Sequence, residues 1–228
     1  MKKYIVSILN TIWKDEKKSY NILLGGVFFL IPPLQLISLG FLSQKMENLI
    51  SLDMKSPKWD QNWKLFFKKG VMLAVILIGY LFIPFLIMFL SGLFTTILSK
   101  GKIMSLFFFR GQVLSFLSDS LFIVALFFLP FAICEAVQEN SWSIYLSKGF
   151  NIPKIMERIL LVIQDYIKVF GIILLLYAVS IGIIFLVLNH IVGFLLSGFI
   201  LFFDGLFSIH LISKVYPRKE IKMKTISE

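Results

Sequence analysis

The apolar residues of this chain gather in long uninterrupted runs that short polar segments separate. Four runs are long enough to cross about 30 Å of hydrocarbon as helices, which takes roughly 20 residues at about 1.5 Å each. They cover residues 71–98, 116–137, 169–188 and 191–212. A stretch such as "IILLLYAVSIGIIFLVL" does not alternate in polarity, so we expect helices and not a barrel. The pattern predicts a single all-α, polytopic membrane domain over residues 1–228.

A fifth apolar run, residues 21–44, carries Pro32 and Pro33 at its midpoint. Neither proline can donate a backbone hydrogen bond, and Pro33 disfavours helical geometry at Pro32. We therefore expect two half-helices of about ten residues, each reaching about 15 Å, that form a re-entrant hairpin. A proline-kinked helix that crosses the membrane is the alternative. In either case Gly25 and Gly26 would let a neighbouring helix approach closely.

Three further segments are amphipathic, and we expect each to form a helix that lies in the membrane surface. They are residues 1–20, 57–69 and 151–165. Tryptophan is a usual anchor at the level of the lipid headgroups, and the candidate anchors are Trp13, Trp59 and Trp63. In the last segment Asn151 is placed to cap the helix, and Pro153 can occupy its first turn without losing a needed hydrogen bond. Residues 102–118 form a weaker candidate of the same kind.

Composition agrees with a lipid environment, since 58% of the residues are hydrophobic and the mean hydropathy is +0.87. The net charge of +10 comes from Lys and Arg beside the ends of the apolar runs, which favours anionic lipids over nucleic acid as the partner. If residues 21–44 turn back, 20 of the 23 Lys and Arg residues lie on one side. The positive-inside rule makes that side the cytoplasm. We expect both termini there, including the basic tail 214–228.

The order of these segments is similar to that in a family of archaeal and bacterial membrane proteins known as domain of unknown function 4013. The similarity lies in "LLGGVFFLIPPLQLISLGFL", "SPKWDQNWKLFFKKGVMLAVI", "GFNIPKIMERILLVIQDYIKVFGIILLL" and a closing helix that ends in "SKVYPR". Its most specific element consists of Pro57, Trp59, Asp60 and Trp63. The resemblance implies a multi-pass membrane protein of a prokaryote, placed in the cytoplasmic membrane. It transfers no catalytic or binding residue.

Few polar residues stand inside the predicted spans, and Asp204 is the best candidate for a functional one. An acidic side chain within a span normally faces a cavity or a partner, and Ser208 lies one turn further along the same helix. We expect Glu135 to lie at the membrane interface and Cys134 to be a packing residue. The sequence contains no recognisable catalytic motif, metal-ligand cluster or cofactor fingerprint, so we expect no cofactor and no metal.

These features favour a non-enzymatic accessory, interaction or protective component of the membrane. Its expected partners are anionic lipids and either another membrane protein or a second copy of the chain. A small transporter or channel subunit, with Asp204 in its pathway, is the alternative. An enzyme that assembles its site from distant helices comes third.

Overall fold

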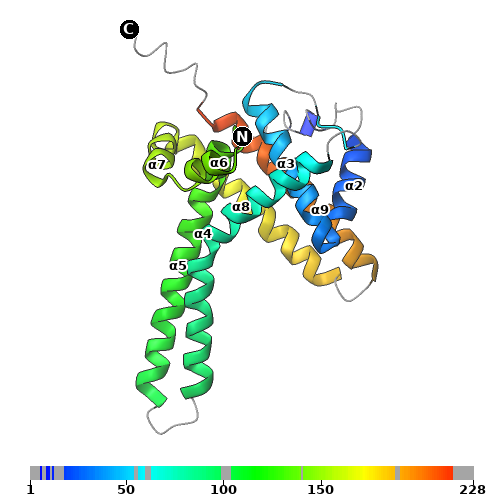
Figure 1. Ribbon diagram of the computed structural model, residues 1–228. Coiled ribbons are helices and arrows are strands. Elements are labelled where there is room, and N and C mark those ends of the chain that lie inside the picture. The colour runs from blue at the N-terminus through cyan, green and yellow to red at the C-terminus, as the bar shows by residue number, and fades with distance from the viewer. Residues whose placement is uncertain are drawn as a thin grey trace. The chain divides into compact units, whose positions relative to one another are not determined.

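The computed structural model describes residues 18–53, 56–59, 63–98, 104–139, 141–187 and 191–217, together with residues 6, 9, 10 and 12. Within these residues the chain is helical and contains no strand, so the all-α prediction is confirmed (Figure 1). The helices are α2 (Lys18–Leu30), α3 (Pro32–Ile50), α4 (Trp63–Leu98), α5 (Met104–Ala136), α6 (Trp142–Gly149), α7 (Ile152–Leu161), α8 (Ile163–Val187) and α9 (Ile191–Val215).

Four helices, α4, α5, α8 and α9, are long and apolar enough to cross a membrane, as predicted. Most are longer than expected, because the flanking amphipathic residues continue the same helix. Thus α4 begins at Trp63 and contains most of the predicted surface helix 57–69, while α5 contains the segment 102–118 from residue 104 onward. Residues 151–165 are divided at Val162 between α7 and the start of α8. The predicted helix 1–20 and the tail 214–228 lie largely outside the described residues.

The chain divides into two compact units, one of which is residues 75–130. This unit contains the greater part of α4 and α5. Within it, Ser118 Oγ donates a hydrogen bond of 2.8 Å to the Pro84 carbonyl, and the rings of Phe85 and Phe122 meet edge to face. The described residues before and after 75–130 form the other unit, which contains the features discussed below.

The helix breaks at the double proline, as predicted. Ile31 is extended, and α3 begins with the two prolines at its N-terminus. Because a proline has no N–H, Pro32 and Pro33 leave the carbonyls of Phe28 and Phe29 without their helical donors. The Ile31 N–H donates to Phe28 O at 3.3 Å, and the Gln35 side-chain amide donates to Phe29 O at 2.8 Å. The break therefore leaves neither carbonyl unpaired.

Beyond this break the chain reverses direction, so that α2 and α3 form a helical hairpin. Ser38 Oγ donates to the Gly25 carbonyl at 3.0 Å although the two residues are 13 apart in sequence. In one straight helix that separation would place them about 20 Å apart. Both helices pack against α9, beside which α2 lies in Figure 1. Two glycines permit this contact, because a Cβ on Gly25 or Gly26 would lie 2.1 or 2.4 Å from the ring of Phe202 or Phe199.

Trp59 occupies the centre of an aromatic cluster between α2, α3 and the start of α4. The ring of Phe41 stacks on it with centroids 4.1 Å apart, and its indole N–H donates to Asn21 Oδ1 at 3.0 Å. Trp59 is only 1% exposed, so the prediction that it anchors the chain in the headgroup layer is wrong. It also precedes α4 and does not share a helical face with Trp63, which is 41% exposed. The role of Trp63 stays a prediction, and Trp13 lies outside the described residues.

The backbones of α3 and α4 touch where two glycines face the opposite helix. A Cβ on Gly40 would lie 1.7 Å from the Phe66 carbonyl oxygen, and one on Gly70 would lie 1.6 Å from that of Leu36. Backbone oxygens cannot move aside as flexible side chains can, so each position requires glycine. This close approach places Glu47 of α3 beside Lys69 of α4, and the two side chains form an ion pair.

Candidate functional site

The predicted intramembrane residue Asp204 lies inside α9 and is 2% exposed. Ser208 is buried one turn along the helix. Within the described part of the chain, Asp204 Oδ2 and Ser208 Oγ have no hydrogen-bond partner. Their polar neighbours on α8 are Ser180 for Asp204 and Tyr177 for Ser208. The structure thus places both predicted residues in one buried polar cluster between two spans.

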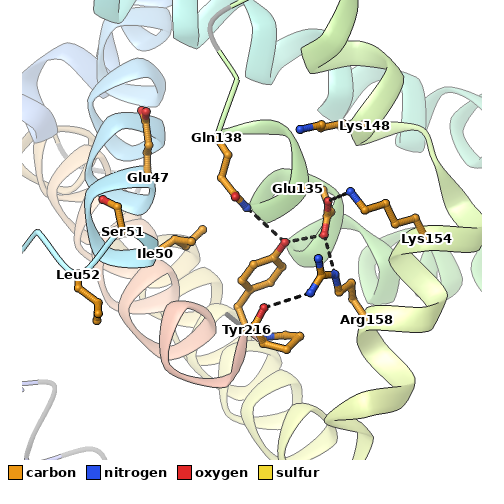
Figure 2. A pocket seen from close by; sticks show the side chains of 11 residues that line it. Glu47, Ile50, Ser51, Leu52, Glu135, Gln138, Lys148, Lys154, Arg158 and Tyr216 are labelled. Atoms are coloured by element: carbon orange, nitrogen blue, oxygen red, sulfur yellow. Dashed lines mark hydrogen bonds and ion pairs between the residues drawn. The ribbon is translucent and has the colours of Figure 1, made fainter. Parts of the chain in front are cut away.

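A second cluster of buried charge surrounds Glu135, which the sequence placed at the membrane interface. Glu135 lies in the last turn of α5 and is 3% exposed, so protein side chains enclose its carboxylate at the end of this span. Its position at the membrane interface stays a prediction. Lys154 Nζ lies 2.7 Å from its Oε2, and Arg158 Nε lies 3.2 Å from its Oε1. The Tyr216 hydroxyl donates to Oε1 at 2.5 Å. Figure 2 shows the carboxylate held between these three side chains.

The start of α7 explains why two cations reach the same carboxylate. Asn151 caps the helix by accepting a hydrogen bond from the Lys154 N–H at 3.2 Å, and Pro153 occupies the first turn, as predicted. Lys154 and Arg158 are four residues apart, so they lie on one face of α7. The neighbouring face buries Ile155 and Ile159 in the protein core. Packing of the apolar face therefore holds both cations in place beside α5.

The end of α9 closes the cluster on another side. The Gln138 amide donates to Tyr216 Oη at 3.3 Å and to the Cys134 carbonyl at 3.0 Å. Arg158 Nη1 donates to the Pro217 carbonyl at 3.4 Å. Burial and the bond to Glu135 raise the pKa of Tyr216, so its hydroxyl keeps its proton and remains a hydrogen-bond donor. These bonds tie the ends of α5, α7 and α9 together.

This cluster forms one wall of an open cavity of about 380 Å³. The cations Lys148, Lys154 and Arg158 line it from α6 and α7, and Glu47 lines it from α3, as Figure 2 shows. Two of these charges have separate partners, because Lys148 pairs with Glu139 and Glu47 pairs with Lys69. Glu47 also borders a second cavity of about 330 Å³ against the start of α4. Ionic side chains thus concentrate where the helices end.

Among the described residues, no three His, Cys, Asp or Glu side chains are grouped so that they could hold a metal ion. Cys134 is fully buried, which agrees with the packing role expected for it. The sequence contained one usable signal for the Glu135 cluster, namely Lys154 and Arg158 on one face of a capped helix. Their acidic partner is 19 and 23 residues earlier, and Tyr216 is 81 residues later, so only the fold reveals the pairing.

Comparison with protein families gives one match. The family described as "Protein of unknown function (DUF4013)" matches residues 24–192 of the 228-residue chain. The matched part begins within α2 and reaches the start of α9, so it includes the hairpin, the aromatic cluster and the three charged residues of α5 and α7. No curated protein and no solved structure matches the chain.

Replacing Glu135 by glutamine should destabilise the protein strongly, because Lys154 and the largely buried Arg158 would lose the buried carboxylate that they share. We expect the free energy of unfolding to fall by about 3 kcal/mol. The loss of helicity on heating, monitored by circular dichroism in detergent, measures this change. It needs no probe attached to Cys134, the residue next to Glu135.

The matched control for this variant is Asp165→Asn, which removes the carboxylate of the exposed Lys168 pair on α8. An exposed pair contributes little, so the control should unfold within about 0.5 kcal/mol of the wild type. Equal stability of the two variants would show that the Glu135 cluster does not hold the helix ends together.

Proposed function

Because this chain belongs to the family of proteins of unknown function DUF4013, we propose its role from its own surfaces: it is a non-enzymatic membrane component that acts by contact. Its contacts are with lipids and with another membrane protein or a second copy of itself. The membrane we propose is the cytoplasmic membrane of a prokaryote. An accessory or protective subunit fits this description, since such a subunit needs apolar contact surfaces and no reaction centre.

The observation that carries the proposal is the small share of span surface that the chain covers itself. In the apolar windows of α4 and α8 only 17% of residues are buried, and in α5 only 22%, whereas the value for α9 is 61%. In water such exposure would be strongly unfavourable. In a membrane these faces contact lipid tails or the spans of a partner. Helix α9 is more buried because α2, α3 and α8 pack against it.

The hairpin of α2 and α3 supports a re-entrant arrangement with both chain termini in the cytoplasm. Its two outer ends, Lys18 and Ile50, lie on the same side because the chain reverses at Ile31. The tip lies near the start of α9, since a Cβ on Gly198 would be 2.5 Å from Leu30 Cγ. That level is about 25 Å along α9 from Val215, so the hairpin reaches deeper than the expected half-helices. This arrangement gathers 20 of the 23 cations on one side.

The test of this role is recovery of the chain from membranes with its surroundings intact. Tagged protein extracted in lipid nanodiscs, without a detergent step, should retain a stoichiometric protein partner, a second copy, or one enriched lipid class. Mass spectrometry of the protein and lipid content provides the measurement. A single inert copy surrounded by lipids in the bulk proportions would contradict the proposal.

A transporter or channel subunit is the second candidate, and the buried cluster at Asp204 favours it. A carboxyl oxygen without a hydrogen-bond partner inside a span is energetically costly, and ionisable side chains at such positions typically line ion or substrate pathways. Purified protein in proteoliposomes should then conduct cations or protons, and Asp204→Asn should reduce that flux at least about tenfold. Asp165→Asn, which changes an exposed carboxylate, is the control and should leave the flux unchanged. Flux that survives Asp204→Asn removes this function.

A further inference from the structure

We propose that the cavity between α3, α6, α7 and the end of α9 binds a monoanionic phosphate group, supplied by the phosphodiester of an anionic phospholipid such as phosphatidylglycerol. The inference rests on the membrane role proposed above and adds to it a defined site. Three independent features of the cavity lead to this ligand: its charge, its level relative to the spans, and an exposed apolar residue that lines it.

The charges that line the cavity from the described residues do not cancel. Lys148 and Glu47 each have an oppositely charged partner of their own. The single carboxylate of Glu135, in contrast, is shared by Lys154 and Arg158. One positive charge is left over at the wall of the cavity, and one phosphodiester carries the single negative charge that would balance it.

Hydrogen-bond donors are also left over on the same side chains. A guanidinium has five N–H donors, and Arg158 uses one at Glu135 and one at the Pro217 carbonyl. An ammonium has three, and Lys154 uses one at Glu135. Phosphate oxygens accept several charge-assisted hydrogen bonds at once and are favoured partners of arginine. A neutral ligand would leave these donors without an acceptor of matching charge.

The level of the cavity suits a lipid headgroup. It lies where α5 ends at Ala136, α9 ends at Val215 and α7 leads into α8, while Glu47 connects it to the start of α4 through Lys69. Ends of spans lie at the membrane interface, where phosphates are found. Basic pockets between spans on the cytoplasmic side are suited to anionic headgroups, and the charge distribution proposed above makes this side cytoplasmic.

One residue that lines the cavity, Leu52, has an unusual backbone conformation. Leu52 is 50% exposed and has φ of 66°, in the left-handed region where glycine is normal. It ends α3 in a Schellman motif, with Leu52 N–H bonded to Leu49 O and Asp53 N–H to Asn48 O. Glycine would fit this position with less strain. An exposed apolar side chain kept there can cover the glycerol and upper acyl carbons of a lipid bound by its phosphate.

The test compares lipid binding by two charge variants of the full chain in detergent. Lys154→Gln removes the surplus positive charge and leaves Arg158 to pair with Glu135. Lys168→Gln, on the exposed surface of α8, removes the same charge elsewhere. Titration with short-chain phosphatidylglycerol, followed by native mass spectrometry, should show at least about tenfold weaker binding for Lys154→Gln and wild-type binding for Lys168→Gln. Equal binding by the two variants overturns the site.

Two further arms identify the source of the phosphate and guard against misfolding. Short-chain phosphatidylethanolamine, which has no net charge, and soluble glycerol 3-phosphate should both bind more weakly than phosphatidylglycerol. Equal binding of phosphatidylethanolamine overturns the assignment to an anionic lipid, and equal binding of glycerol 3-phosphate overturns the assignment to a lipid. Leu52→Gly should unfold at a higher temperature than the wild type yet bind phosphatidylglycerol more weakly, and unchanged binding counts against the site. If phosphatidylglycerol selectivity fails while nanodisc extraction still recovers a stoichiometric protein partner, the headgroup site is wrong and the proposed role stands.

Discussion

A hydrocarbon interior offers no water to a polar group, and the whole arrangement of this chain follows from that constraint. Backbone groups must find partners within the chain, and charges must be paired or moved to the interface. At the double proline, the Gln35 amide and the Ile31 N–H donate hydrogen bonds to the two carbonyls that have no helical donor, so the backbone groups there are paired. The ion pairs at Glu135 and Glu47 meet the second, because they collect buried charge where the spans end. Asp204 differs from these groups, because it is buried within a span and its Oδ2 has no hydrogen-bond partner among the described residues.

The charged cluster also explains how short surface helices are fastened to long spans. Since hydrophobicity does not hold helices together inside a lipid phase, specific hydrogen bonds and close packing must do so. Glu135 on α5 receives bonds from α7 and from the residue that follows α9, so one carboxylate fixes three helix ends. Close contact through Gly40 and Gly70 fixes α3 on α4 in the same unit. A cavity bordered by such fixed groups is preorganised, so binding a ligand there costs little ordering.

Sequence reasoning succeeded where the signal is local. The four spans follow from runs of apolar residues, the break at Pro32 from the absence of an N–H, and the cap at Asn151 from its position before Pro153. It failed where the decisive contact is distant in sequence. Trp59 resembled an interface anchor because its partners are not its neighbours in the sequence. Phe41, which stacks on its ring, belongs to α3, and only the hairpin brings Asn21 to its indole N–H. For Glu135 the sequence predicted only a position near the end of a span. A carboxylate there pairs with headgroups or with cations, and only the fold shows that Lys154 and Arg158 are its partners.

The re-entrant hairpin decides which side of the membrane carries the cations and the cavity. Single thiols introduced as Lys3→Cys and Lys55→Cys, each in a Cys134→Ser background, mark the two ends of this segment. An impermeant thiol reagent applied to intact cells should leave both unlabelled, while Lys102→Cys, in the connection between α4 and α5, should be labelled. Labelling of one hairpin end while the other stays protected would show that the segment crosses the membrane, and would contradict the account.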